Sequence, residues 1–145
     1  MKRFPARRRR RAGFTLVEVL LVMVIIVVIA ALAIRNYGAA QRTALMRAAK
    51  AQVQELSSLI EQYNLDCRQY PVQDGLEALI QPPADLADPT KWGGPYLQKP
   101  VLPPDPWERP YQYSYPSAHG LEGPDIFSAG PDGQPGTEDD IGNWL

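Results

Sequence analysis

A single carboxylate stands inside an otherwise apolar stretch near the start of the chain. Between residues 14 and 34 the only polar side chains are those of Thr15 and Glu18. A carboxylate inside a bilayer costs on the order of 2.5 to 3.5 kcal/mol on insertion scales, so it is rarely found there without a partner. Glu18 is therefore the first candidate for a functional side chain.

The residues leave two interpretations of Glu18 open. Because it lies only four residues beyond the start of the apolar stretch, its carboxylate can reach the level of the lipid headgroups and need no partner. Alternatively, a cut between Gly13 and Phe14 would create an α-amino group with a pKa near ~8. That cation would be available to the carboxylate of a neighbouring copy, and Glu18 would then favour self-assembly.

A second cluster of acidic side chains lies in the C-terminal segment SAGPDGQPGTEDDIGNWL. Its acids, Asp132, Glu138, Asp139 and Asp140, stand among glycines and prolines, which permit tight turns. Ca²⁺ accepts carboxylate and backbone carbonyl oxygens at irregular geometry, so such a loop suits this ion. The spacing is not that of an EF-hand, and a solvated acidic loop without a metal is an equally good interpretation of the composition.

The other residues with catalytic potential form no recognisable arrangement. His119, the only histidine, lies in a loop rich in proline and glycine, and no serine lies in a nucleophile-elbow sequence. Cys67 is the only cysteine, so the chain contains no internal disulfide. The sequence therefore predicts that the protein is not an enzyme.

The apolar stretch is long enough to cross a membrane. Its 21 residues would form a helix of roughly 30 Å, the thickness of a bilayer's hydrocarbon core. Basic residues precede it at Lys2, Arg3 and 7–11, and an excess of positive charge holds a flank in the cytoplasm. We expect the rest of the chain to lie outside the cytoplasm. The basic cluster is thus a topology signal rather than a nucleic-acid site.

One helix is expected to continue beyond this membrane segment. No proline occurs between residues 14 and 70, and Gly38 is the only glycine there. Apolar residues recur on one face at a mean spacing of 3.6, at Leu45, Ala49, Val53, Leu56, Ile60 and Tyr63. We expect residues 14–34 to form the transmembrane half of the helix and residues 35–65 an amphipathic half on which a small domain folds.

Residues 66–145 are expected to form that domain. Eleven of the fifteen prolines lie between residues 71 and 116, which excludes long helices there. The segment VQDGLEALIQPP allows one short helix with Leu76, Leu79 and Ile80 turned inward. The segments PYQYSYP and DIFS have the composition of short strands. The predicted fold class is α+β, with a long N-terminal α-helix packed on a small antiparallel sheet with extended loops.

The junction RRRRRAGFTLVEVLLVMVII resembles the N-terminal processing region of the type IV pilin class. The resemblance implies that residues 1–13 are a leader, that a prepilin peptidase cuts after Gly13, and that the new N-terminal residue, Phe14, is N-methylated. It also implies that Glu18 pairs with the N-terminus of a neighbouring subunit during assembly. The implied fold is type IV pilin-like.

The remainder of the chain is similar to the major pseudopilins, or G subunits, of type II secretion. The similarity runs through YNLDCRQYPVQDGLEALIQPP, WGGPYLQKPVLPPDPWERPYQYSYP and DIFSAGPDGQPGTEDDIGNW. It implies a structural subunit of a periplasmic filament that drives folded exoproteins through the outer-membrane secretin. It also implies a single-pass protein of the bacterial inner membrane with its C-terminal domain in the periplasm. The implied partners are further copies of the chain, minor pseudopilins, the inner-membrane assembly platform and the prepilin peptidase.

In that family the final loop binds a structural Ca²⁺ ion. The resemblance carries this site onto carboxylates and backbone carbonyls of the C-terminal segment. By position, the carboxylates are those of Asp132, Asp139 and Asp140, and the carbonyls come from around Ala129, Pro135 and Thr137.

The chain departs from the family at two positions of the apolar helix. Val27 and Arg35 stand where members usually carry a glycine and a proline. Those helix breakers are associated with local unwinding in assembled filaments, so the behaviour of this helix on assembly stays open.

The nearest alternative is a type IV pilin subunit of a surface fibre for adhesion or motility. Many such pilins close their C-terminal loop with a cysteine pair, which a chain with one cysteine cannot form. A membrane-tethered calcium-binding module that never polymerises is a further alternative, which an uncut N-terminus would favour.

Overall fold

The computed structural model describes residues 13–145, with the side chains of residues 33–37 left out of the description. The predicted leader therefore lies outside the described residues except for Gly13. The dominant element is helix α1, Leu16–Cys67, which spans 52 residues. This confirms the single long helix expected from the lack of proline. Its backbone is helical at both Val27 and Arg35, as expected where no breaker is present.

The chain divides into two units, Met1–Ala40 and Gln41–Leu145. In the first unit the apolar side chains of α1 are exposed on every side, from Leu16 through Leu32. Among the residues that the structure describes, no helix reaches the length and hydropathy required for a membrane span. The transmembrane segment expected at residues 14–34 is therefore not shown by the structure.

In the second unit, α1 supplies one wall of the hydrophobic core. The residues on its buried face are Ala49, Val53, Leu56, Ile60, Tyr63 and Cys67. This is the stripe predicted from the helical spacing, with two differences: Leu45 at its start is only partly buried, and Cys67 extends it at the end of the helix. Arg47, Lys50 and Glu61 lie exposed on other faces. In this unit the face of α1 predicted from the spacing is therefore the one that packs on the core.

Two short 3₁₀ helices follow α1: η1, Gly75–Leu79, and η2, Pro89–Lys91. The predicted short helix is η1, with Leu76 and Leu79 buried as expected. Ile80 is only partly buried, and Ala78 takes the third core position instead. The reason is the tighter winding, because three residues per turn place residues 76 and 79 on one line and turn residue 80 away.

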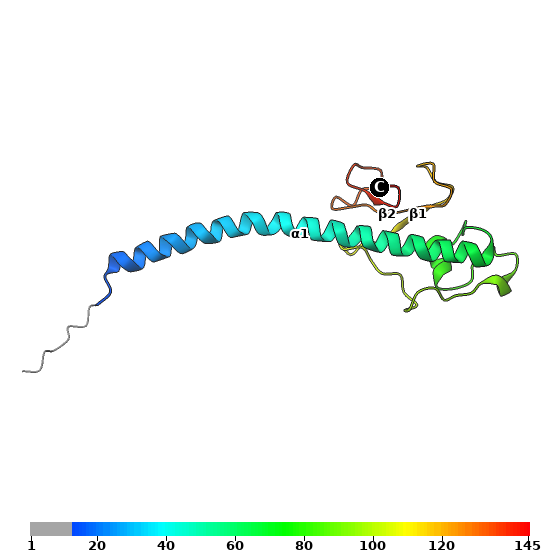
Figure 1. The fold of residues 1–145 in the computed structure, drawn as a ribbon, viewed down its shortest axis with the longest axis horizontal. Coiled ribbons are helices and arrows are strands. Elements are labelled where there is room, and N and C mark those ends of the chain that lie inside the picture. Colours follow the sequence, from blue (N-terminus) through cyan, green and yellow to red (C-terminus); the bar gives the residue numbers. More distant parts are fainter. Residues whose placement is uncertain (1–12) are drawn as a thin grey trace, which may run out of the picture. The chain divides into compact units, whose positions relative to one another are not determined.

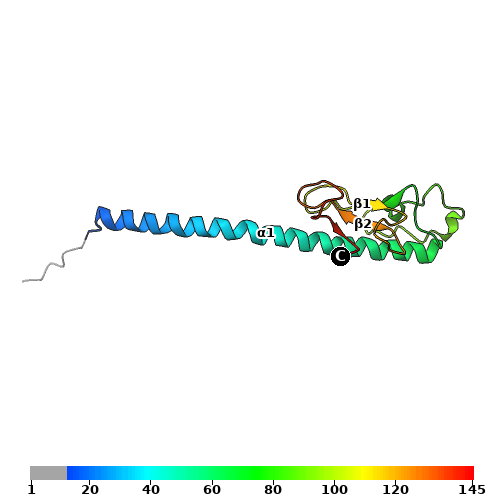
Figure 2. The ribbon, with the colours of Figure 1, turned by 90° about the horizontal axis from the view of Figure 1, so that it is seen from above.

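The sheet consists of three short antiparallel strands in the order β1-β2-β3. Strand β1 is Gln112–Ser114, β2 is Asp125–Ser128 and β3 is Ile141–Gly142. The register places Tyr113 opposite Ile126 and Ser128 opposite Ile141. In both Figure 1 and Figure 2 strands β1 and β2 lie beside the second half of α1, and Ile126 is fully buried in the core. Both strands predicted from PYQYSYP and DIFS are confirmed.

Candidate functional site

Glu18 lies in the first turn of α1 and exchanges three hydrogen bonds with Thr15. The backbone amide and the hydroxyl of Thr15 donate to Oε2 of Glu18 over 2.8 and 2.9 Å. The amide of Glu18 donates back to the Thr15 hydroxyl over 3.3 Å. This is the pattern of a capping box, which the spacing Thr15-x-x-Glu18 already indicates in the sequence. The carboxylate retains lone pairs for a further donor, because each oxygen accepts two hydrogen bonds.

The proposed cleavage point is open to solvent on the described side. Phe14 is 86% exposed, and Gly13 and Phe14 precede the first residue of α1. The residue after the proposed cut is therefore exposed and lies outside the helix.

The acidic loop, defined here as residues 129–140, joins β2 to β3. Because Ser128 at the end of β2 pairs with Ile141 at the start of β3, the two ends of the loop lie next to each other. Gly130, with φ +60°, makes this closure possible, because a Cβ there would lie 2.2 Å from the carbonyl oxygen of Asp139. The amide of Gly133 donates to the Ala129 carbonyl over 3.1 Å. Residues at the two ends of the loop are thus in direct contact.

Asp139 links the two halves of the acidic loop. The hydroxyl of Thr137 donates to Oδ1 of Asp139 over 2.8 Å and lowers the pKa of this carboxyl, as does the backbone amide of Asp132. The charge of Arg42 on α1 acts in the same direction. The structure therefore brings Asp139 against the backbone of the predicted ligand Asp132.

Asp140 carries the least satisfied carboxylate oxygen of the loop. Its Oδ2 accepts from the amide of Gly136 over 2.7 Å, whereas Oδ1 is buried without a hydrogen-bond partner in the described structure. A buried carboxylate oxygen without a donor is costly, and a bound cation would remove that cost by coordinating it. This orphaned oxygen is the observation that fits the predicted metal.

Two of the predicted carbonyl ligands accept hydrogen bonds within the loop. The Ala129 and Thr137 carbonyls already accept from the amides of Gly133 and Asp140, although each carbonyl has a second lone pair. In the described part of the chain, no three acidic, histidine or cysteine side chains converge on a common metal position. The loop thus offers hard oxygen donors of the type that calcium uses, but its carboxylates alone do not form a cage.

A buried acid that sequence reasoning missed supports the loop from the side. Asp105 is 3% exposed, and its Oδ1 accepts from the amides of Trp107 and Arg109 over 3.0 and 2.8 Å. The hydroxyl of Ser128, at the end of β2, donates to its Oδ2. The segment DPWER contains the only sequence signal for this arrangement, an Asp-Pro turn start, and it does not indicate the partner 23 residues away.

His119 has a partner that its sequence context did not reveal. Its Nδ1 lies 2.9 Å from Oδ2 of Asp125, the first residue of β2. The ring stacks on Trp144, with the ring centroids 3.7 Å apart and the planes 7° from parallel. No arrangement around His119 was recognisable in the sequence because its partner lies on a strand that folds back beside the loop.

Asp125 is almost fully buried, and hydrogen-bond donors stabilise its ionised form. Burial alone would raise its pKa, but hydrogen bonds from Ser117, His119 and the amide of Ala118 prevail, and the pKa is lowered. A carboxyl with a lowered pKa in the folded state stabilises the fold above its unfolded pKa of about 3.9, and this contribution is lost as the pH falls through the folded value.

We therefore expect Asp125→Asn to lower the free energy of unfolding at pH 7 by about 1 to 3 kcal/mol. The difference from wild type should shrink below about pH 4, where the carboxyl of the unfolded wild-type chain takes up a proton, and it should vanish as the pH falls through the lower pKa of the folded chain. Urea unfolding at pH 7 and at pH 3.5 measures both values. Glu77→Gln, at an exposed position, is the control. A difference that stays constant with pH would exclude the ionised carboxylate as the stabilising group.

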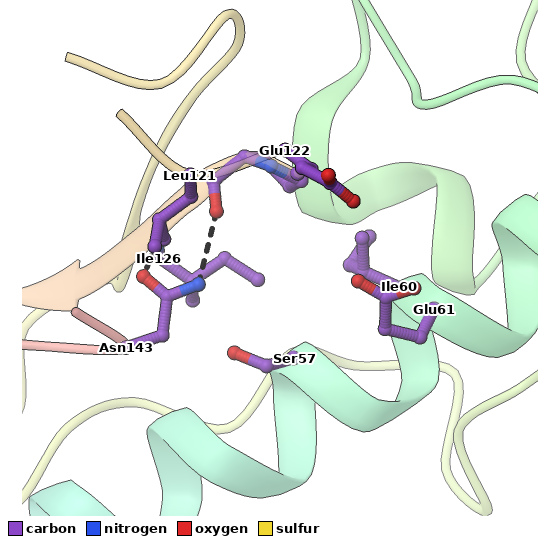
Figure 3. A pocket seen from close by; sticks show the side chains of 9 residues that line it. Ser57, Ile60, Glu61, Leu121, Glu122, Ile126 and Asn143 are labelled. Atoms are coloured by element: carbon purple, nitrogen blue, oxygen red, sulfur yellow. Dashed lines mark hydrogen bonds between the residues drawn. The ribbon is translucent and has the colours of Figure 1, made fainter. Parts of the chain in front are cut away.

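A small pocket lies between α1 and the segment that precedes β2 (Figure 3). It has a volume of about 230 Å³ and is lined by Ser57, Ile60, Glu61, Leu121, Glu122, Gly123, Pro124, Ile126 and Asn143. Its polar groups serve the fold: Ser57 donates to the Val53 carbonyl, and Asn143 donates to the Pro124 carbonyl. Their arrangement is not that of a nucleophile with a base.

Comparison with known families matches nearly the whole chain in two segments. The family described as type II secretion system (T2SS), protein G, matches residues 36–144. The family described as prokaryotic N-terminal methylation motif matches residues 8–34, which include Gly13, Phe14 and Glu18.

Individual relatives show the same similarity over most of their length. Type II secretion system core protein G of Pectobacterium carotovorum subsp. carotovorum is 42% identical over 137 residues, covering 93% of this chain and 85% of the relative. Its counterpart in Pseudomonas aeruginosa is 40% identical over 143 residues, covering 94% and 97%. The crystal structure of the major pseudopilin of enterohaemorrhagic Escherichia coli superposes with a TM-score of 0.64 at 37% identity, covering 73% of this chain and 87% of that one.

Proposed function

Because the chain belongs to the protein G family of the type II secretion system, it is a structural subunit of the pseudopilus, and we propose that it is the major subunit. In this role, copies polymerise in the periplasm and drive folded exoproteins through the outer-membrane secretin. The observation that carries the assignment is the match over residues 36–144, since related pilins share the N-terminal segment.

The chain assembles with other components of the secretion system, and its proposed partners follow from its two halves. The N-terminal methylation motif supports cleavage by a prepilin peptidase after Gly13 and methylation of Phe14. Exposed apolar side chains along residues 14–32 support self-assembly through α1. Minor pseudopilins and the inner-membrane assembly platform complete the proposed set of partners.

The subunit is proposed to be anchored in the inner membrane before assembly, with residues 35–145 in the periplasm. The apolar residues 14–34 and the basic residues before them support this orientation. A membrane-anchored periplasmic protein also agrees with the methylation motif.

A structural Ca²⁺ ion is proposed to bind the acidic loop. Asp132, Asp139 and Asp140 would hold it through carboxylates, with carbonyls from around Ala129, Pro135 and Thr137. Support comes from Oδ1 of Asp140, which is buried without a hydrogen-bond partner in the described part of the chain. A divalent cation would supply the positive charge that neighbouring carboxylates need.

The proposed role is tested by deleting the gene for this chain and comparing secreted with periplasmic proteins, while surface fibres are imaged in the same cultures. Accumulation of normally secreted enzymes in the periplasm is the expected result. Unchanged secretion together with the loss of surface fibres would instead identify a type IV pilin. Complementation with the wild-type chain is the control.

A further inference from the structure

Arg109 reaches from a separate turn to the backbone of the acidic loop. Its Nη1 donates to the Gly130 carbonyl over 2.9 Å, and its Nη2 donates to the Pro131 carbonyl over 3.3 Å. The guanidinium packs so closely on the loop that a Cβ at Gly133, where φ is +71°, would lie 2.1 Å from Nη1. One side chain thus holds two consecutive carbonyls at the start of the loop.

The turn of residues 105–109 orients this arginine. Its backbone closes on itself, because the amide of Asp105 donates to the Arg109 carbonyl over 2.7 Å and the amide of Arg109 donates to Asp105 Oδ1. Ser128 ties the turn to the end of β2 through Asp105 Oδ2, and the amide of Gly130 donates to the same hydroxyl over 3.2 Å. Arg109 is therefore connected to the core through a buried network rather than held only by the loop.

The two halves of the acidic loop are held by different kinds of groups. Residues 129–133 are bound by Arg109 and by the Ser128 hydroxyl. Residues 134–140 are held largely by the loop's own acids, since Gln134 donates to Asp132, Gly136 to Asp140 and Thr137 to Asp139. These carboxylates repel one another unless a cation is present.

We propose that Arg109 is a positioning residue that fixes residues 129–133 in the metal-free chain, so that a bound divalent cation needs to order only residues 134–140. This inference rests on the calcium site proposed above. A guanidinium is a planar fork of donors that stays charged at any physiological pH, which suits two neighbouring carbonyls better than an ammonium does. Ordering half of the loop beforehand lowers the entropy cost of binding and so tightens it.

If Arg109 acted only through its charge, its removal would change the Ca²⁺ affinity in the opposite direction. A positive charge next to a cation site repels the ion, so its removal would tighten Ca²⁺ binding. Arg109→Met removes both the fork and the charge, whereas Arg109→Lys keeps the charge and loses the fork. Positioning predicts that both variants bind Ca²⁺ about ten-fold more weakly. Arg42→Met is the matched control, because Arg42 contributes charge near Asp139 from α1.

The experiment uses the full chain in detergent micelles. Amide hydrogen exchange is followed separately for residues 129–133 and 134–140, with chelator and with Ca²⁺, and Ca²⁺ affinity is measured by calorimetry. In wild type with chelator, we expect slow exchange in the first segment and fast exchange in the second. In Arg109→Met with chelator, exchange in the first segment should rise at least ten-fold, whereas in Arg42→Met it should not.

Two results would overturn the proposal: wild-type exchange rates for residues 129–133 in both Arg109 variants, or tighter Ca²⁺ binding by Arg109→Met with unchanged binding by Arg109→Lys. If Arg109→Met does not fold, exchange and Ca²⁺ affinity of Arg109→Lys decide between the two roles. A wild-type chain that shows no response to Ca²⁺ rejects the metal site alone, because the exchange of residues 129–133 in chelator still tests the positioning role.

Discussion

Replacement of Glu18 by alanine is expected to abolish filament assembly while leaving the folded periplasmic domain intact. Pairing with the N-terminal amine of a neighbour would remove the membrane cost of the carboxylate, about 3 kcal/mol, which corresponds to a factor on the order of a hundred in an association constant. The alanine variant cannot form this ion pair. It also lacks the membrane cost of the carboxylate, which would favour transfer of the subunit from the bilayer to the filament. Sedimentation of sheared filaments from cells that overproduce the chain measures the polymer directly.

The capping box at the start of α1 requires a control for this experiment. Glu18→Gln keeps an acceptor for the Thr15 amide and hydroxyl but carries no charge, so it separates the cap from the ion pair. We expect the glutamine variant to fail in assembly as the alanine variant does, with Thr15→Val assembling normally. Normal polymers from Glu18→Gln would show that the cap, not the pairing, is the function of this residue.

Removal of Ca²⁺ is expected to lower the melting temperature of the domain by on the order of 10 to 20 °C. A ligand present at a hundred times its dissociation constant stabilises the native state by about 2.7 kcal/mol, and a domain of this size shifts by several degrees per kcal/mol. Calorimetry of the purified chain with Ca²⁺ and with chelator measures the shift.

A substitution at the orphaned carboxylate sharpens the calcium test. Asp140→Asn keeps the shape of the side chain and its acceptor for the Gly136 amide but removes the charge. Its melting temperature should be low and should respond weakly to Ca²⁺, and Mg²⁺ should not replace Ca²⁺ in wild type because it demands a tighter octahedral geometry. A chelator that leaves the wild-type melting temperature unchanged would eliminate the metal site.

The helix and the two longer strands were predictable because their signals are local. Residues that share a face of α1 recur every three to four positions, aromatic and polar residues alternate around Tyr113, and the composition of DIFS favours a strand around Ile126. The winding of η1 was not predictable, since a 3₁₀ turn and an α turn bury nearly the same residues. The two kinds of turn differ only in which of Ala78 and Ile80 they bury.

The site was predictable only in part, because its supports come from distant segments. The acids of the loop stand out in the sequence, whereas Arg109 reaches the loop across 21 residues and Asp105 reaches Ser128 across 23. No periodicity connects such pairs. His119 and Asp125 are only six residues apart, but their contact depends on the fold of the intervening loop.

The burial of Cys67 gives the chain a built-in reporter of unfolding. Its thiol is 5% exposed at the end of α1, and burial raises its pKa, so little reactive thiolate is present in the native state. Because it is the only cysteine, a thiol-specific reagent labels a molecule only after its domain has opened. The rate of labelling therefore measures the opening of the core around Tyr63 directly, without an introduced probe.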